Sequence, residues 1–364
     1  MTELLKVLGL FDHNGVERSQ RSLRAEDRVP GPYRVDLLMD QGVDLRTMRM
    51  VTHPLHKKLR DLVEHRTGVR TDLAIRGIPA AVSSDVVLAI LEDKSVLPSL
   101  LRQRSLPPYS RRRLSVVSCW WGEELLNGEH DTRDEIKRAI KGLDQIFVFS
   151  RNQVPIFEEA GAGERVIPVS FGVDHHNFRP ETGHGRRYQV FSAGFDRGRD
   201  FETLVAAARL LPDVRFDIVT QMDILRGEVA PANVTVHAPT DGEGHRNNLL
   251  AADLIVIPTH DLAYPTGQSV LLEGMASGRP VVVTRTAAMA EYIEEGQSNF
   301  SMPLHDPAGV AATISRLLAA PDLLDEVGVR ARTAVEKRYT FELMWREIAG
   351  HLKLGLQTTA GAAE

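Results

Sequence analysis

Short apolar runs that alternate with stretches of helical pattern are the feature of this sequence that most restricts its fold. Residues 84–91 (SDVVLAIL) and 253–258 (DLIVIP) are almost continuously apolar over the length of one strand. Strands without a polar face are typical of parallel sheets that helices cover on both sides. Because the alternation continues along the chain, the sequence predicts an α/β protein with doubly wound parallel sheets.

The order of these elements predicts two domains, which a chain of 364 residues is long enough to form. Residues 171–187 are rich in Gly, His, Pro and Arg, a composition typical of a linker between domains. We therefore expect a first domain at residues 1–172 and a second at 173–339. Strands are predicted at residues 4–11, 34–39, 73–76, 84–91, 113–119, 145–150 and 165–170, and then at 189–193, 214–220, 234–237, 253–258, 281–285 and 301–304.

Composition excludes several classes of protein. Hydrophobic residues make up 43% and charged residues 26% of the chain, as in soluble globular proteins. The net charge of −5 gives no global electrostatic case for a nucleic-acid partner, and the basic run at 111–113 is interpreted as a solvated loop. The single cysteine, Cys119, cannot form an intramolecular disulfide or a thiolate metal site.

No apolar run approaches the roughly 20 residues of a membrane span, and the N-terminus lacks the long apolar core of a signal peptide. We therefore expect a cytoplasmic protein without a membrane span. Peripheral membrane contact through basic residues of the first half is left open.

Residues 264–280 (YPTGQSVLLEGMASGRP) predict a helix that begins near Gly267 and ends before Pro280. The start of a helix presents unpaired backbone N–H groups and about half a positive charge, so it can bind an anion. Glu273 lies one turn further in, within an apolar stretch where a carboxylate needs a polar partner. The pattern suits a sugar nucleotide, with its diphosphate on the N–H groups and its ribose on Glu273. An ordinary helix whose glutamate reaches solvent explains this segment alone equally well.

A second cationic element follows the predicted strand at 189–193, where Arg197 and Arg199 lie beside two glycines. Loops at the carboxyl ends of parallel strands face the ligand crevice of such folds. Guanidinium groups match phosphate oxygens in pairs and remain charged. A solvated loop paired with Asp196 and Asp200 is the alternative, but the helix start at Gly267 favours phosphate binding.

Other residues suggest chemistry less strongly. His13 and Glu92 fall near strand ends of the first domain, where either could polarise an acceptor hydroxyl or serve as an ordinary surface group. The pair Trp120–Trp121 could pack in the core or form an aromatic wall facing a sugar or acceptor. His175–His176 is interpreted as a surface pair. No HExxH or His/Cys spacing predicts a metal, and no GxSxG or GxxxxGK[ST] motif predicts a triad hydrolase or a phosphate-loop ATPase.

The chain resembles a known family over about 330 residues, and five segments carry this resemblance. They are NGVER at 14–18, GLDQI at 142–146 with VFS at 148–150, FGVD at 171–174 with FRP at 178–180, the glycine loop at 194–204, and EGMASGRPVV at 273–282. In these segments the chain resembles the retaining glycosyltransferases of the GT-B fold, in the broad family 4 group.

The resemblance implies two Rossmann-like domains that face an interdomain cleft, with the acceptor in the first and the sugar nucleotide held mainly by the second. It implies that the last helix, at residues 340–364, crosses back onto the first domain. It also implies metal-independent sugar transfer with retention. The partners would be a nucleoside-diphosphate sugar, as co-substrate and without a further cofactor, and a small-molecule or glycan acceptor.

The resemblance also implies roles for single residues. Arg199 would neutralise the diphosphate leaving group with help from Arg197, and Glu273 would hold the ribose. The other expected donor contacts are the backbone at Gly267, Gln268 and Ser269, the close approach allowed by Gly15, and base contacts near Thr220 and His237. His13 and Trp121 are expected on the acceptor side.

Several positions depart from the family pattern. Pro265 stands where the family has the first acidic residue of its E-x7-E pair, and Asp261 and His260 are the nearest substitutes. The strand that often ends in histidine here ends in Glu92, which we hypothesise to take the polar role at the sugar or acceptor. These departures keep two alternatives open: a non-catalytic sugar-nucleotide-binding relative, and another sugar-nucleotide enzyme, such as an epimerase, on the same fold.

Overall fold

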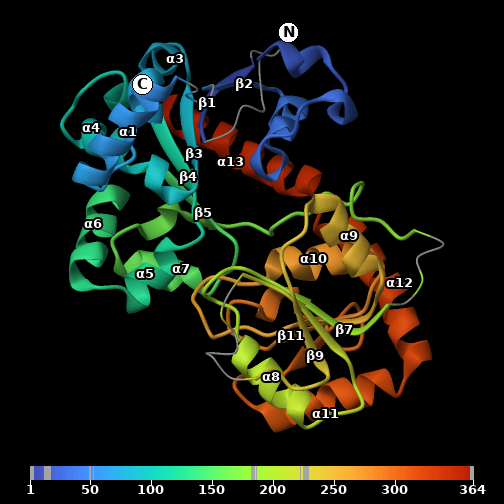
Figure 1. Ribbon diagram of the computed structural model, residues 1–364. Helices are drawn as coiled ribbons and strands as arrows, with labels where there is room; N and C mark the ends of the chain where they lie inside the picture. The colour runs from blue at the N-terminus through green and yellow to red at the C-terminus, as the bar shows by residue number, and fades with distance from the viewer. Residues whose placement is uncertain are drawn as a thin grey trace. The chain divides into compact units, whose positions relative to one another are not determined.

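The computed structural model describes residues 4–11, 18–48, 51, 53–181, 185, 187–221, 223 and 229–360, and it forms two compact units (Figure 1). Unit 1 comprises Met1–Ser170 and Phe341–Glu364, and unit 2 comprises Phe171–Thr340. The chain thus passes between units after residues 170 and 340, where the linker composition predicted boundaries after 172 and 339. No helix within the described ranges is long and apolar enough to cross a membrane.

Unit 1 contains a six-stranded parallel sheet with the strand order β2-β1-β3-β4-β5-β6. Its strands are β1 (Leu5–Leu10), β2 (Val43–Thr47), β3 (Val86–Ile90), β4 (Arg113–Val117), β5 (Gln145–Val148) and β6 (Val166–Pro168). Its α-helices are α1 (Pro54–Thr67), α2 (Asp72–Arg76), α3 (Ile78–Val82), α4 (Val96–Gln103), α5 (Trp121–Asn127), α6 (His130–Ile140), α7 (Gln153–Glu159) and α13 (Phe341–Ala360). Short 3-10 helices are η1 (Arg18–Ser22), η2 (Ala25–Asp27), η3 (Pro32–Gln41), η4 (Glu92–Lys94), η5 (Tyr109–Arg111) and η6 (Gly163–Arg165).

Helices cover both faces of this sheet. Ile146 and Val148 point into the hydrophobic cluster formed with α4, α5, α6 and α7. On the opposite face, the ring of Phe147 lies 6.2 Å from that of His351 on α13, and the side chain of Gln145 donates to the carbonyl of His351. Alternate side chains of one strand therefore enter two separate cores, as expected for a doubly wound sheet.

Two strands predicted for the first domain are helical. Residues 34–39 lie in η3, which begins with Pro32 and ends at Gly42 in the left-handed conformation. All five residues from Val35 to Met39 are buried, so the pattern of burial does not distinguish this helix from a buried strand. The second strand along the chain is instead β2, which begins immediately after Gly42 and lies at one edge of the sheet.

The segment predicted as a strand at 73–76 belongs to α2. One carboxylate oxygen of Glu64, at the end of α1, accepts hydrogen bonds from the backbone N–H groups of Thr71 (2.8 Å) and Asp72 (3.0 Å). A carboxylate at that point satisfies N–H groups that have no partner within a helix. This contact across the turn fixes a helix start that the short apolar run did not reveal.

The last helix, α13, packs on unit 1 (Figure 1). The indole N–H of Trp345 donates to the carbonyl of Tyr33 at 2.6 Å, and the ring of Phe341 lies 6.5 Å from that of Tyr33. Trp345 is fully buried. The helix is therefore part of the core of unit 1 although 170 residues of unit 2 precede it in the chain.

Unit 2 contains a second six-stranded parallel sheet with the order β12-β11-β10-β7-β8-β9. Its strands are β7 (Tyr188–Ala193), β8 (Phe216–Val219), β9 (Val234–His237), β10 (Ala252–Ile257), β11 (Val281–Thr284) and β12 (Phe300–Met302). Its helices are α8 (Phe201–Arg209), α9 (Gly242–Leu250), α10 (Gln268–Ala276), α11 (Pro307–Leu318), α12 (Pro321–Arg338) and the short 3-10 helix η7 (Ala290–Tyr292).

The strand order of unit 2 reverses between β7 and β10. From β7 the chain passes through α8 to β8 on one side, whereas β10 pairs with β7 on the other side. In open α/β sheets, ligands bind outside the carboxyl ends of the strands at such a reversal point. We therefore expect a ligand site of this unit at the loops that follow β7 and β10.

Candidate functional site

Asp196 ties together the two loops at the reversal point of unit 2. Its Oδ1 accepts hydrogen bonds from the backbone N–H of Gly198 (2.8 Å), the hydroxyl of Thr266 (2.9 Å) and the hydroxyl of Tyr264 (3.2 Å). One carboxylate thus closes the turn after β7 and holds the segment that leads into α10. Sequence reasoning considered Asp196 only as a partner that would neutralise the arginines of this loop.

Arg199 is buried beneath this network, with 5% of its surface exposed. Its Nε lies 3.4 Å from Oδ2 of Asp196 but, like Nη1, makes no hydrogen bond. Burial lowers the pKa of Arg199, while the charge of Asp196 opposes that shift. A guanidinium remains protonated near neutral pH, so a positive charge with unused donors is buried at this point.

The side chain of Arg199 lies against two glycines that leave room for it. A Cβ at Gly194 would be only 2.2 Å from Nε, and a Cβ at Gly267 would be 2.9 Å from Nη1. Gly267 has φ +85°, a left-handed conformation that favours glycine, and it directly precedes α10. The sequence placed the arginine loop and the start of this helix at one phosphate site, and the structure brings them together.

The start of α10 presents the backbone N–H groups of Gly267 and Ser269, whereas the N–H of Gln268 already donates to the carbonyl of Pro265 at 3.2 Å. Binding of a ligand by these three residues stays a prediction. No side chain caps this helix. Ser269 is exposed, whereas Gln268 is buried and its Oε1 has no hydrogen-bond partner. The uncapped N–H groups and the unpaired Nη1 of Arg199 therefore lie at one end of one helix, an arrangement that can bind a dianionic or trianionic group.

Glu273 is partly exposed and has a partner that the sequence analysis did not name. Its Oε2 lies 2.9 Å from Nε2 of His245, the first-turn histidine of α9. The side chains of both residues are 21% exposed. A carboxylate oriented by an imidazole and open to solvent can accept hydrogen bonds from ligand hydroxyls. Nothing in the sequence spacing of 28 residues indicated this pair.

The remaining predicted donor residues lie at the same edge of the sheet or outside the described residues. Arg197 is exposed, beside the buried Arg199. Thr220 follows β8, and its backbone N–H donates to the carbonyl of His237 at 3.2 Å. The ring of His237 is turned to Asp217, with 2.8 Å between Nε2 and Oδ1. Gly15 and, on the acceptor side, His13 lie outside the described residues.

Glu92 begins η4, two residues after the end of β3 in unit 1, and is buried. Its Oε1 accepts a hydrogen bond from the hydroxyl of Ser118 (2.9 Å) and from the backbone N–H groups of Cys119, Trp120 and Trp121. This oxygen therefore serves the start of α5. Burial and the charge of Glu92 raise the pKa of the Cys119 thiol, so that thiol stays protonated near neutral pH. A contact of Glu92 with sugar or acceptor stays a prediction.

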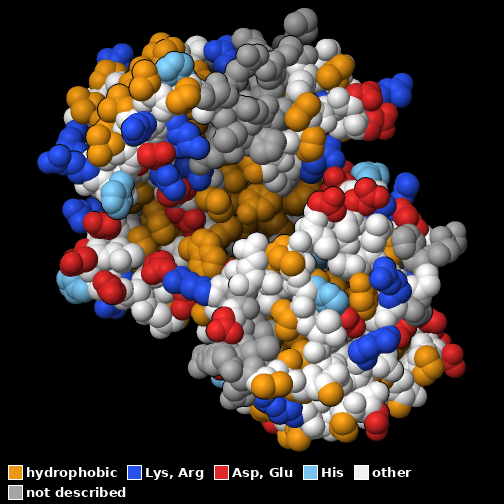
Figure 2. All heavy atoms as spheres, in the orientation of Figure 1, with side chains coloured by type: hydrophobic (Ala, Val, Ile, Leu, Met, Phe, Trp, Pro, Cys, Tyr) orange, Lys and Arg blue, Asp and Glu red, His pale blue; other side chains and the backbone are white. Residues whose placement is uncertain are grey.

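A cavity of about 590 Å³ lies within unit 1 beside Glu92. Leu91, Trp120 and Trp121 contribute to its apolar wall, and Glu124 and Glu135 contribute carboxylates. Figure 2 shows hydrophobic side chains next to acidic ones over the part of unit 1 that carries α1, α4, α5 and α6. Trp121 also packs in the core of the unit, as one of the two interpretations expected, and its contact with a sugar or acceptor stays a prediction.

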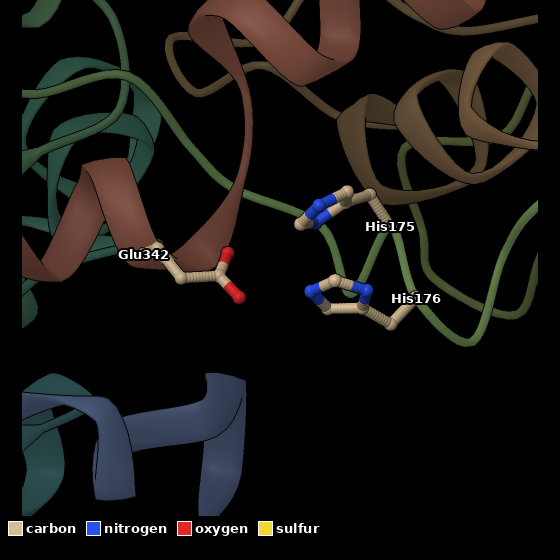
Figure 3. A group of neighbouring side chains, drawn as sticks. All are labelled: His175, His176 and Glu342. Atoms are coloured by element: carbon tan, nitrogen blue, oxygen red, sulfur yellow. The ribbon is translucent and has the colours of Figure 1, made fainter. Parts of the chain in front are cut away.

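His175 and His176 lie after the start of unit 2, with their ring centroids 4.0 Å apart (Figure 3). His176 is exposed and His175 is half-buried, which agrees with the expected surface pair. The carboxylate in the same view belongs to Glu342, in the first turn of α13.

Comparison with solved structures defines the fold class. Sucrose-phosphate synthase from Thermosynechococcus elongatus matches with a TM-score of 0.72 and 17% identity, covering 99% of this chain and 100% of that one. The Anabaena protein HepE, solved in complex with UDP-glucose, matches with a TM-score of 0.66 and 15% identity, covering 96% and 99%. At this identity the matches show the fold, which is the predicted GT-B type with two doubly wound parallel-sheet domains.

Comparison of sequences supports the family resemblance. Residues 190–320, which contain the loops around Arg199 and Gly267, match the family described as glycosyl transferases group 1. The D-inositol 3-phosphate glycosyltransferase of Mycolicibacterium gilvum is 26% identical over 236 residues, which are 59% of this chain and 50% of that protein. The chain thus resembles the group 1 glycosyltransferases, as its motifs predicted, and spans about half the length of this curated relative.

Proposed function

We propose that this chain is a glycosyltransferase that moves a sugar from a nucleoside-diphosphate sugar to a small-molecule or glycan acceptor. One observation carries the proposal: on the buried guanidinium of Arg199, Nη1 makes no hydrogen bond and Nε has only the ion pair with Asp196, beside the uncapped start of α10. Unused donors on a buried charge are costly unless a ligand completes them. A diphosphate supplies the negative oxygens that both elements lack.

The same arrangement suits the chemistry of the transfer. When the bond between the sugar and the diphosphate breaks, negative charge grows on the departing phosphate oxygens. Fixed donors that already point at those oxygens stabilise the transition state without having to reorganise. Arg199 and the N–H groups near Gly267 would supply this stabilisation, so we propose that the transfer itself needs no metal ion and no further cofactor.

The proposal also covers the ribose contact, the donor, the stereochemistry of transfer, the location of the protein and the acceptor. Glu273, oriented by His245, would accept hydrogen bonds from the ribose hydroxyls. The known complex of the Anabaena protein with UDP-glucose supports a sugar nucleotide as donor. Retention of the anomeric configuration rests on the resemblance of residues 273–282 to the motif of retaining enzymes. We propose a cytoplasmic location, and the cavity beside Trp120 and Trp121 as the place to test for the acceptor.

The first experiment measures ligand binding by thermal shift with UDP, GDP, dTDP and their sugars. A ligand present at 100 times its dissociation constant adds about 2.7 kcal/mol of apparent stability. We expect such a shift with at least one nucleotide for the wild type and none for Arg199→Ala. A matched control is Arg209→Ala, which removes an exposed arginine at the other end of α8.

Turnover separates the proposal from its alternatives. With the donor found by thermal shift, Arg199→Ala should lower kcat/KM by about 10²-fold or more, as removal of one transition-state donor does. A near-normal rate would contradict the role of Arg199. Pro265, which stands where a carboxylate is usual, favours a non-catalytic binding relative as the second candidate. That candidate predicts a thermal shift but no release of nucleoside diphosphate, even during long incubation with donor alone.

A further inference from the structure

Three side chains able to bind a metal ion meet at the carboxyl edge of the unit 2 sheet, apart from the residues assigned to the diphosphate. They are Asp200, His260 and His305, which come from the segments that follow β7, β10 and β12. The gaps of 60 and 45 residues between them explain why sequence spacing gave no sign of a metal site. The fold assembles them because the carboxyl ends of parallel strands lie at one edge.

The distances among the three fit one small ion. Nδ1 of His260 lies 3.0 Å from Nε2 of His305, and Nε2 of His305 lies 3.6 Å from Oδ2 of Asp200. One ligand atom from each residue lies within 4.8 Å of the others. Two ligands that each lie about 2.0–2.1 Å from a tetrahedral zinc are about 3.3–3.4 Å apart. The two measured distances bracket that separation, so small side-chain rotations suffice to complete the site.

The backbone already fixes two of the three residues. The N–H of His260 donates to the carbonyl of Gly198 at 2.9 Å, which joins the loop after β10 to the loop after β7. Asp200 is the N-cap of α8 and is buried. The hydroxyl of Thr203 donates to its Oδ2 at 2.6 Å and the N–H of Thr203 to its Oδ1 at 3.1 Å. Such hydrogen bonds orient a carboxylate toward a metal in known sites.

His305 has an unusual backbone conformation for its side chain. Its φ is +51°, in the left-handed region that glycine adopts readily and other residues adopt at a cost. A side chain retained at such a position points to a function of that side chain. Here the strained residue is the one that brings its imidazole next to His260 and Asp200.

We propose that Asp200, His260 and His305 bind one divalent transition-metal ion of the zinc class. Two imidazoles and one carboxylate are ligands that suit Zn²⁺ or Co²⁺, whereas Mg²⁺ and Ca²⁺ require mainly oxygen ligands. Three protein ligands leave a coordination position for water or a small ligand. The bound ion links three loops of unit 2, and two of its ligands adjoin the proposed donor site: Asp200 directly follows Arg199, and His260 is one of the nearest substitutes for the acidic residue absent at Pro265. The metal titration uses no sugar nucleotide, so its result does not depend on the proposed transfer.

The contact between the imidazoles has an alternative explanation. In the absence of an ion, one ring nitrogen can donate a hydrogen bond to the other, and the 3.0 Å distance fits that arrangement equally well. The two explanations differ in one respect: only a ligand site requires both imidazoles for tight metal binding. Direct metal binding is therefore the decisive measurement.

The experiment titrates the metal-free full-length chain with Co²⁺, followed by visible absorption, and then displaces the Co²⁺ with Zn²⁺. We expect one ion per chain, with the strong absorption bands of tetrahedral or five-coordinate cobalt. His305→Gly is the key variant, because glycine removes the ligand and also relieves the positive φ, so the variant should fold normally. His260→Ala removes the second ligand.

Both variants should weaken metal binding by at least about 100-fold. Changing a residue that only orients a ligand weakens binding by 10- to 100-fold, and loss of the ligand itself should have a larger effect. Thr203→Ala should weaken it by about 10-fold or more through the orientation of Asp200. His65→Ala, which removes an exposed histidine of unit 1, should change nothing. The proposal is overturned if the wild type binds no ion, or if His305→Gly and His260→Ala bind it as the wild type does. Binding at the pair His175–His176 would produce the latter result.

Discussion

Asp196 couples the charge of one residue to the position of two loops in unit 2. Burial by itself would raise the pKa of Asp196, but the charge of Arg199 and the hydrogen bonds from Thr266, Gly198 and Tyr264 outweigh it and lower the pKa. A carboxylate whose pKa is lower in the folded state stabilises the fold above its unfolded pKa. That stabilisation is lost as the pH falls through the folded pKa.

Asp196→Asn should therefore destabilise unit 2 at pH 7, by about 1.5–3 kcal/mol for hydrogen bonds to a charged group. The difference from the wild type should shrink below about pH 4, the usual pKa of an unfolded aspartate. Urea unfolding followed by circular dichroism at pH 7 and pH 3 measures this difference in the free energy of unfolding. All three tryptophans, Trp120, Trp121 and Trp345, are in unit 1, so the fluorescence transition should not move. An equal difference at both pH values would show that the charge of Asp196 is unimportant.

At the level of single residues, the sequence indicated the elements of the proposed anion site better than it indicated their partners. Arg199 and Gly267 could be predicted because glycine, arginine and a helix start each have a local signature. His245 beside Glu273 could not, because the contact depends on how α9 packs against α10. The contact between Asp200 and His305 could not be predicted either, because their two loops meet only after the sheet has formed.

Among the secondary-structure elements, α5 depends most clearly on a residue from elsewhere. Its first backbone N–H groups converge on Oε1 of Glu92, which leaves from the end of β3. A negative charge at a helix start stabilises it through the unpaired donors and the helix dipole. The position of α5, and of the wall that Trp120 and Trp121 form in the cavity, thus depends on this carboxylate.

Glu92→Gln keeps an oxygen acceptor but loses the charge, so it should destabilise unit 1 by about 1 kcal/mol. Glu92→Ala leaves several buried donors unpaired and should cost about 2–4 kcal/mol. Urea unfolding followed by tryptophan fluorescence measures both, and the exposed Glu129→Gln is the control. If both Glu92 variants unfold like the wild type, Glu92 does not hold α5. If Glu92→Gln leaves kcat/KM unchanged, the hypothesis that Glu92 contacts sugar or acceptor is wrong.

Elements with strong periodicity were predicted best. The strand β3 lies within its predicted apolar run at 84–91, and β10 begins one residue before its predicted run at 253–258. The errors at 34–39 and 73–76 have a common cause: short apolar runs do not distinguish a strand from a helix. In both segments, a contact with a residue from elsewhere in the chain favours the helix. Trp345 of α13 bonds to the carbonyl of Tyr33 in η3, and Glu64 bonds to the start of α2.

On the scale of the whole molecule, unit 2 is one continuous stretch inserted into unit 1. Its two ends meet: the backbone N–H of Val173 donates to the carbonyl of Tyr339 at 2.9 Å, and Val173 forms a bridge with Thr340. Unit 2 also has its own hydrophobic core, formed by β7, β8, β10, β11 and β12 with α8, α11 and α12. Units with a separate core and adjacent ends are typical of domains that fold independently.

Residues 171–340, produced as a separate polypeptide, should therefore fold cooperatively and bind the same nucleoside diphosphate as the full chain. Every residue of the proposed diphosphate site in the described part of the chain lies within this range. Calorimetry with and without the nucleotide measures both properties, and Arg199→Ala in the same fragment is the control. A fragment that folds but binds nothing would show that unit 1 supplies an essential donor contact.

The position of α13 in unit 1 has a consequence under mechanical load. A pulling force applied to the two ends of the polypeptide acts first on unit 1, because β1 and α13 both belong to it. The force is borne by contacts such as those of Trp345 with Tyr33 and Gln145 with His351. While they hold, no tension reaches Val173 and Tyr339, and unit 2 bears no load. Detachment of α13 is therefore the first mechanical event, and unit 2 carries load only afterwards.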